Sequence, residues 1–313
     1  MKDGYNRMIT YMRLSVTDKC NFNCKYCSPY SVHSHSDSIL NFEEYYEICK
    51  TAVDLGVQKI RLTGGEPLIR NGIIEFCERL SALEGLNQLV MTTNGSLLKD
   101  NAKSLRDAGV SRLNISLDTL NFEKFKSITG TDKLQSVIDG IKTAQITGFE
   151  EIKLNVVLIG GFNIDEIYDF VSLTRENNIS VRFIELMPIG ETKTWDKDKY
   201  VNADIVLERV PELSRIFFDG VSEVYQIEGF KGTVGLIRPM SNKFCDICNK
   251  IRVTCDGKIK TCLHSGDEYS LRGLTGVDLK NAMINAIANK PHSHNLSSSC
   301  FSLTDRFMNE IGG

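Results

Sequence analysis

The stretch MRLSVTDKCNFNCKYC (residues 12–27) joins a strand-like run to a loop that carries three cysteines. Their spacing, C-x3-C-x2-C, brings Cys20, Cys24 and Cys27 close enough to bind one inorganic group. A closed metal site takes four protein ligands, whereas three thiolates on a four-iron cluster leave one iron without a protein ligand. A 4Fe–4S cluster whose open iron binds a small molecule would therefore account for a set of three cysteines.

Strand-like and helical segments alternate along the first two thirds of the chain. The strand-like runs are 12–17, 59–64, 88–93, 112–118, 152–159 and 181–187. In the first helical segment Tyr45, Ile48 and Ala52 share one side of a helix that ends at Gly56, and Asn163 is the expected N-cap of the last. Such alternation predicts a parallel sheet with helices outside, either an open doubly wound sheet or a partial barrel.

The C-terminal third has a different pattern. Residues 195 to about 225 are weakly helical, and from residue 231 short strands and turns surround four cysteines. We expect two domains, a core over residues 5–222 and a C-terminal domain over residues 223–313. The cysteine loop follows the first strand, at the end where parallel α/β barrels have their active sites.

Bulk composition narrows the class of protein. The chain has 313 residues and a net charge of -3, which gives no sign of a nucleic-acid-binding surface. It has no apolar run of signal-peptide length and none near the ~20 residues of a membrane span. We therefore expect a cytoplasmic protein, whose ten cysteines bind metal where clustered and pack in the core where scattered, like Cys49 and Cys77.

A second cysteine set lies in FCDICNKIRVTCDGKIKTC (residues 244–262). Asp256-Gly257 predicts a two-residue hairpin turn that pairs Thr254 with Ile259. Folding there returns Cys262 toward Cys245 and Cys248, again giving three ligands. Cys255 abuts the turn and is expected not to be a ligand, and Cys300 has no assigned role.

Basic residues occur in strands whose inward side should be apolar. Lys59 and Arg61 are two residues apart and share a face, and other strands add Arg13, Lys153 and Arg182. Such charges are costly to bury unless an anion binds them. With Lys250 and Arg252 they suit a triphosphate. The alternative is that each lies at a strand end in contact with solvent.

The cysteine loop resembles that of the radical S-adenosylmethionine (SAM) superfamily, and LTGGEP (62–67) adds to the resemblance. Alternatives are a zinc site completed by His33 or His35, and a chance spacing. The resemblance implies a partial (β/α)6 TIM-like barrel with SAM on the open iron. One electron then cleaves SAM to a 5'-deoxyadenosyl radical that removes a hydrogen atom from an unactivated C–H bond. The implied SAM contacts are Tyr26, Gly65, Glu66, Ser116 and Met187.

Nearly the whole chain is similar to the GTP 3',8-cyclase family of molybdenum cofactor biosynthesis, including KIRLTGGEPL, MTTNG, LNISLD, KLNVV, RFIELMP and the terminal Gly312-Gly313. The resemblance implies conversion of GTP to (8S)-3',8-cyclo-7,8-dihydroguanosine 5'-triphosphate. It also implies a second 4Fe–4S cluster whose open iron holds guanine, and a catalytic role for the diglycine. Matching GTP contacts are Arg13, Arg61, Thr92, Lys153, Lys250 and Arg252, with lysine at 250 where the family usually has arginine.

The resemblance further implies partners. These are an electron donor and a downstream cyclic pyranopterin monophosphate synthase, and a homodimer is compatible with it. Two other functions stay open at this stage. One is a radical SAM peptide-modifying enzyme with an auxiliary cluster, and the other is a zinc-stabilised binding module without catalysis.

Overall fold

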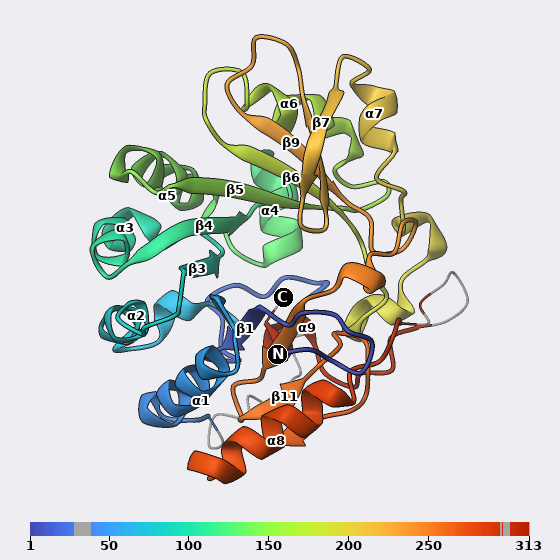
Figure 1. Ribbon diagram of the computed structural model, residues 1–313. Coiled ribbons are helices and arrows are strands. Elements are labelled where there is room, and N and C mark those ends of the chain that lie inside the picture. The colour runs from blue at the N-terminus through green and yellow to red at the C-terminus, as the bar shows by residue number, and fades with distance from the viewer. Residues whose placement is uncertain (28–38, 295, 297–300, 313) are drawn as a thin grey trace.

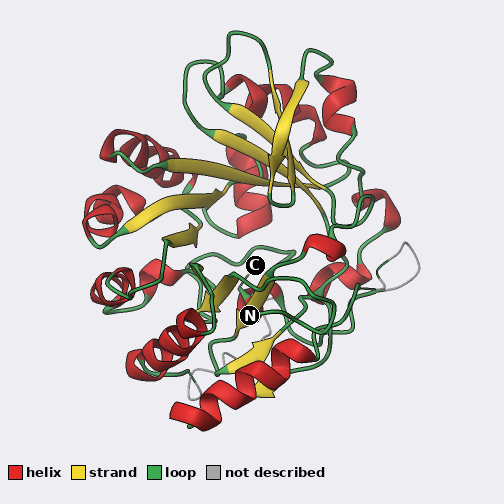
Figure 2. Ribbon diagram, viewed as in Figure 1, coloured by secondary structure: helices red, strands yellow, loops and turns green. Residues whose placement is uncertain are grey.

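The computed structural model of the protein describes residues 1–27, 39–294, 296 and 301–312 (Figures 1 and 2). His33, His35, Cys300 and Gly313, named above, lie outside these ranges. Within them the strands form one sheet in the order β12-β11-β10-β1-β2-β3-β4-β5-β6-β9-β8-β7. Figure 2 shows helices along the outside of this curved sheet.

Residues 11–185 build six parallel strands in sequential order. The strands are β1 (Tyr11–Ser15), β2 (Lys59–Thr63), β3 (Gln88–Thr93), β4 (Val110–Ser116), β5 (Glu151–Leu158) and β6 (Ser180–Glu185). The helices are α1 (Phe42–Asp54), α2 (Ile73–Ser81), α3 (Leu98–Asp107), α4 (Phe122–Thr129), α5 (Leu134–Thr147) and α6 (Ile167–Ser172). The predicted partial barrel is confirmed, and all six expected strands are present.

The C-terminal part extends both edges of the barrel. Its elements are α7 (Ile205–Arg209), β7 (Ser214–Asp219), β8 (Ser222–Gln226), β9 (Thr233–Ile237), β10 (Lys250–Val253), β11 (Lys258–Lys260), β12 (Tyr269–Ser270), α8 (Gly276–Ala288) and α9 (Met308–Ile311). Strand β10 pairs in parallel with β1, and β9 pairs in parallel with β6. The sheet is therefore continuous across the proposed domain boundary, which falls at the start of β8 and stays a prediction.

Helix α1 shows how the local sequence sets an element. Asn41 caps its first turn in a reciprocal capping box with Glu44. Tyr45, Ile48 and Ala52 are buried against the sheet, as their spacing predicts. The helix stops before Gly56, whose φ of 100° favours glycine.

Asn163 occupies the N-cap position predicted from the sequence, but its side chain does not cap the helical turn that follows. Its buried side chain donates to the carbonyl oxygens of Asp118 and Val157, both at 2.8 Å, and accepts from the amide of Ile159. The following segment begins as a short 3-10 helix, Ile164–Glu166, and α6 ends at Ser172. The asparagine is held by two strand ends rather than by the helix.

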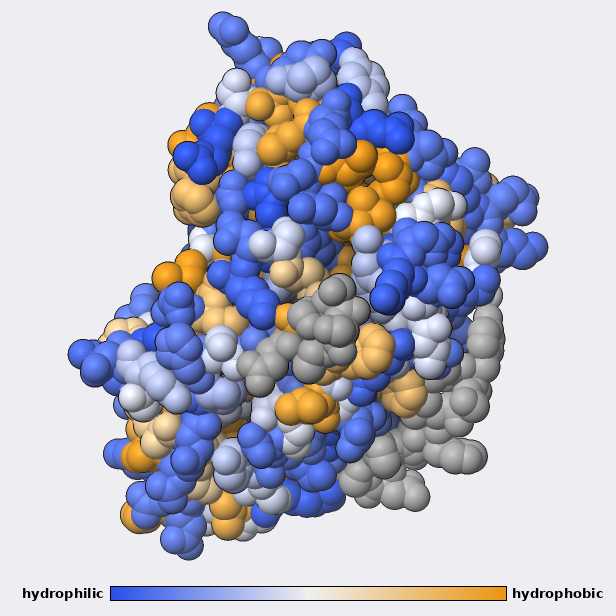
Figure 3. All heavy atoms as spheres, turned by 90° about the vertical axis from the view of Figure 1, so that its right-hand side faces the viewer, coloured by the Kyte–Doolittle hydropathy of each residue, from blue (hydrophilic) through white to orange (hydrophobic). Residues whose placement is uncertain are grey.

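The weakly helical pattern over residues 195–225 is mostly wrong as a structural prediction. The helical structure there is limited to short turns and α7, and the segment ends in the antiparallel β7–β8 hairpin. Ile216, Phe217 and Phe218 of β7 are about half exposed, so this edge strand lacks the alternation of a half-buried strand. Figure 3 shows that apolar patches on that side of the molecule gather mainly in its upper half.

The β10–β11 hairpin forms with a register shifted by one residue. Val253 pairs with Ile259, and the amide of Thr254 bonds to the carbonyl of Lys258. The loop is therefore three residues long, with Gly257 in the left-handed region at φ 83°. A left-handed glycine at the end of a three-residue loop is a common hairpin geometry. The predicted turn position is right and its predicted length is wrong.

Candidate active site

Both cysteine triads line one cavity of about 690 Å³ inside the barrel. Cys20, Cys24 and Cys27 reach it from the loop after β1. The second triad, Cys245, Cys248 and Cys262, reaches it from the C-terminal part. The pairing of β10 with β1 brings the two parts of the chain together. The two triads therefore face a shared chamber.

The first cysteine loop is anchored on α4 and β3. The amides of Asn23 and Lys25 bond to carbonyls at the end of α4, and the Asn94 side chain lies 3.8 Å from the sulfur of Cys20. Burial raises the pKa of the Cys20 thiol to about 11 and that of Cys27 to about 12. Thiolates in this position therefore need a positive partner such as iron.

The second triad sits among lysines. Burial opposes ionisation of Cys248, but the charges of Lys290 and Lys250 outweigh it and lower the pKa of this thiol. Cys255 is buried and does not line the cavity, which agrees with its predicted non-ligand role. Cys49 and Cys77 pack in the core on α1 and α2, as predicted.

The two triads have a donor set that fits iron–sulfur clusters. None of the six forms a disulfide, and in each triad the thiols interact electrostatically with one another. Within the described ranges, no three His, Cys, Asp or Glu side chains are placed to hold a metal ion. A four-iron cluster has a wider geometry, because each thiolate binds its own iron. The ligand roles of the six cysteines stay predictions.

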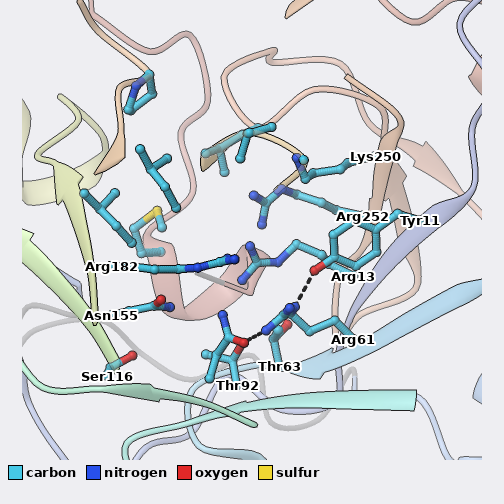
Figure 4. Close-up of a pocket in the computed structure, with 18 of the residues that line it drawn as sticks. Tyr11, Arg13, Arg61, Thr63, Thr92, Ser116, Asn155, Arg182, Lys250 and Arg252 are labelled. Carbon is cyan, nitrogen blue, oxygen red and sulfur yellow. Dashed lines mark hydrogen bonds between the residues drawn. The ribbon is translucent and has the colours of Figure 1, made fainter. Parts of the chain in front are cut away.

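Strand register explains why the cations converge. Across β10, β1 and β2 one row of neighbours is Lys250, Tyr11 and Lys59, and the next inward row is Arg252, Arg13 and Arg61. On the opposite wall a row joins Thr92, Asn114 and Lys153, and another joins Ser116, Asn155 and Arg182. Figure 4 shows the guanidinium groups of Arg13, Arg182 and Arg252 turned toward the same space.

All eight residues predicted to bind substrate therefore line the cavity: Arg13, Lys59, Arg61, Thr92, Lys153, Arg182, Lys250 and Arg252. Seven of them are cationic, and most are largely buried. An anion in the cavity would offset the cost of burying so many like charges. The alternative, in which each lies at a strand end in solvent, does not describe this arrangement.

Tyr11 was not predicted from the sequence. Its hydroxyl accepts a hydrogen bond from Arg61, and the ammonium groups of Lys59 and Lys250 lie 5.2 and 5.9 Å from its ring centroid. Burial works against its ionisation, but the charges of Arg61, Arg13 and Lys59 outweigh it and lower its pKa to about 7. The sequence does not show that Tyr11 lies among the cations, because tyrosine is common in strands. Its place there follows only from the strand register.

Four of the five predicted SAM contacts line the cavity: Tyr26, Gly65, Ser116 and Met187. The Tyr26 hydroxyl donates to Asp118 at 2.6 Å, and a Cβ on Gly65 would lie 2.0 Å from the carbonyl oxygen of Lys19. Glu66 is different: it is fully buried and does not line the cavity. Its carboxylate accepts from the Thr93 hydroxyl and the Asn94 amide, so it holds the end of β3.

Most of helix α9 and Gly312, the last described part of the C-terminal tail, are buried inside the molecule. Arg252 Nη1 donates to the carbonyl oxygens of Gly312 at 2.6 Å and Ile311 at 3.2 Å. Gly312 has φ 70°, and a Cβ there would lie 2.0 Å from Oγ1 of Thr63, a cavity residue. The tail therefore reaches the cavity wall beside a predicted substrate contact.

Two family models match the chain. The Radical SAM superfamily matches residues 14–174, and Molybdenum Cofactor Synthesis C matches residues 179–296. The fold, the cysteine loop and the first match define a radical SAM protein, a class that uses a 4Fe–4S cluster and SAM. Within the described residues no helix has the length and apolar character needed to cross a membrane.

Full-length relatives define the family more narrowly. A GTP 3',8-cyclase of Peptoclostridium acidaminophilum is 48% identical over 320 residues, covering 99% of this chain and 98% of that protein. A GTP 3',8-cyclase of Alkaliphilus oremlandii is 44% identical over 322 residues, covering 100% of each. The chain belongs to the GTP 3',8-cyclase family. The predicted cofactors, two 4Fe–4S clusters and SAM, are those of this family.

Solved structures show the same fold at low identity. Streptococcus suis SuiB aligns with a TM-score of 0.61 and 13% identity, covering 92% of this chain and 68% of SuiB. SuiB bound to the precursor peptide SuiA aligns with a TM-score of 0.59 and 13% identity, covering 95% and 76%. At these identities the likeness concerns the fold alone.

Proposed function

We propose that this protein converts GTP to (8S)-3',8-cyclo-7,8-dihydroguanosine 5'-triphosphate, the first step of molybdenum cofactor biosynthesis. Family membership supports the reaction. The observation that carries it is a single cavity lined by two cysteine triads and seven cationic side chains. A triphosphate suits those cations, and the two triads provide separate places for SAM and for the guanine base.

Each part of the cavity has a proposed role. Cys20, Cys24 and Cys27 would hold one cluster, and Cys245, Cys248 and Cys262 the other. When bound, the first cluster and SAM supply the radical that takes the ribose C3' hydrogen atom. The protein's own part is positioning: arginine forks and lysines hold the triphosphate so that C3' faces the SAM side and C8 stays within reach.

The tail and the buried walls complete the proposal. The contact of Arg252 with Gly312 beside Thr63 supports a catalytic role for Gly312. Gly313 carries the same proposed role and lies outside the described residues. Tight walls around a radical reaction exclude competing hydrogen donors.

Anaerobic incubation with GTP, SAM and a reductant tests the function. We expect the cyclised triphosphate as product and 5'-deoxyadenosine in equal amount. A Cys24→Ser variant should yield neither product. Failure to consume GTP, together with modification of an added peptide, would contradict the proposal and favour a peptide-modifying enzyme.

We also propose the cellular setting that the family resemblance implies. The product would pass to a cyclic pyranopterin monophosphate synthase, and a cytoplasmic electron donor would reduce the first cluster. A homodimer is compatible with this arrangement. Size-exclusion chromatography with light scattering and a coupled assay with that synthase would test these points.

A further inference from the structure

Asp219 places a carboxylate among the cations that face the cavity. Of the described residues that line the cavity, two are acidic, Asp118 and Asp219. Asp118 serves the cysteine loop, because it accepts from the Tyr26 hydroxyl. Asp219, at the end of β7, accepts from Lys153 Nζ at 2.8 Å and from Arg182 Nη2.

The two cations that hold Asp219 are proposed triphosphate contacts. Lys153 has a second carboxylate partner in Glu151 at 2.6 Å. Arg182 forms its ion pair with Asp219 through Nη2. The Nε of Arg182 has no hydrogen-bond partner among the described residues. Burial favours the neutral form of Asp219, but Lys153, Arg182 and Lys59 together lower its pKa to about 2. The carboxylate is therefore charged at any working pH.

A phosphate group cannot join this pair without conflict. If a triphosphate reached Lys153 and Arg182 while Asp219 stayed in place, anionic oxygens would crowd a carboxylate at hydrogen-bond range. Like charges at that distance repel strongly in a partly buried site. Either the carboxylate leaves or the phosphate binds elsewhere.

Strand β7, which carries Asp219, is weakly packed, although Asp219 pairs with the fully buried Ser222 of β8. Strand β7 is the last strand of the sheet and pairs only with β8 in the described structure. Ile216, Phe217 and Phe218 are half exposed, so moving this strand would break little packing. Gly220 follows Asp219 at φ 62° with open space around it. The Asp219 side chain itself is 43% exposed.

We propose that Asp219 is an internal competitor for the substrate's triphosphate: it holds Lys153 and Arg182 before substrate binds, and the triphosphate displaces it. This inference rests on the proposed function and adds a determinant of specificity to it. A ligand with few negative charges cannot replace the carboxylate, whereas a triphosphate can. The tip of the β7–β8 hairpin thus selects for the phosphate chain while leaving the guanine and ribose contacts unaffected.

Tripolyphosphate is the probe, because it binds without guanine, SAM or turnover. Calorimetric titration of the anaerobic protein should show that Asp219→Asn binds it about fivefold more tightly than wild type, the upper range for a partly exposed ion pair. Asp219→Ser is a second neutral variant and should do the same. Asp219→Glu keeps the charge and should bind like wild type.

Asp204→Asn is the matched control. Asp204 accepts from Arg238 at 2.6 Å, has a 53% exposed side chain and does not line the cavity. The Asp204→Asn variant should bind tripolyphosphate with the same affinity as the wild-type protein. Thermal unfolding of each variant checks that it is folded.

The outcomes separate the two proposals. Unchanged or weaker tripolyphosphate binding in both neutral variants, or no binding in any protein, would overturn the role of Asp219. If GTP is still cyclised in that case, the proposed function stands. If GTP is not cyclised but the neutral variants bind tripolyphosphate more tightly, the anion competition stands and the proposed function fails.

Discussion

Cys255 and Cys262 lie beyond opposite ends of β11 and have opposite environments. Cys262 lines the cavity with Cys245 and Cys248, whereas Cys255 is 1% exposed behind the loop. Spacing alone predicted this division. It did not predict Tyr11, Asp118 or Asp219, because their importance depends on which residues lie beside them in neighbouring strands and hairpins.

Replacing Cys262 with serine should remove one cluster. We expect the iron content of anaerobically purified protein to fall from about eight to about four per chain. Cys255→Ser should leave it at about eight, because that thiol has no access to the cavity. Iron analysis and visible absorption measure both. Equal iron loss in the two variants would contradict the assigned ligand set.

Tyr11 should make anion binding depend on pH. Its lowered pKa of about 7 means that a negative phenolate forms among the cations as the pH rises through 7, so affinity for GTP should fall there. Lys59, whose pKa burial lowers to about 8, acts in the same direction at higher pH. In Tyr11→Phe the fall near pH 7 should disappear. An identical pH profile in wild type and variant would exclude this role.

Elements that join strand ends carry much of the site geometry. The Asn163 side chain links the ends of β4 and β5, because it donates hydrogen bonds to the carbonyl oxygens of Asp118 and Val157. The sequence pattern assigned it to a helix start because asparagine is a favoured N-cap. A buried asparagine that bonds to three backbone groups has no distinct sequence signal, and strand register is equally invisible.

Asn163→Ala should destabilise the protein more than loss of an ordinary cap. It leaves buried backbone groups without partners, which we expect to cost about 3 kcal/mol. Asn121→Ala is the comparison, because Asn121 caps α4 with one bond to the Lys124 amide and its loss should cost about 1 kcal/mol. Urea unfolding followed by circular dichroism measures both. A smaller loss of unfolding free energy in Asn163→Ala than in Asn121→Ala would contradict this role of Asn163.

At the scale of the whole molecule, the C-terminal part closes the site that the barrel begins. Strand β10 extends β1, and the tail returns to meet Arg252 and Thr63. The sequence predicted a partial barrel and a second cysteine set, each from local pattern. It could not predict that one sheet spans both parts, because the pairing of β10 with β1 is set by contacts across most of the chain.

Gly312→Ala should uncouple the tail from the cavity. The added methyl group would meet Oγ1 of Thr63 and strain a left-handed backbone. We expect product formation to fall at least about tenfold, as when reacting groups are mispositioned. Iron content and SAM binding should match wild type. Gly229→Ala, at a positive φ with open space and away from the cavity, is the control for backbone strain alone.

The central claim is that the second triad faces the substrate in the shared cavity. Electron paramagnetic resonance of a Cys20→Ser, Cys24→Ser, Cys27→Ser variant, reduced so that only the second cluster gives a signal, tests it most directly. The account predicts that GTP shifts this spectrum and that SAM does not. A spectrum that GTP leaves unchanged at saturating concentration would contradict the account.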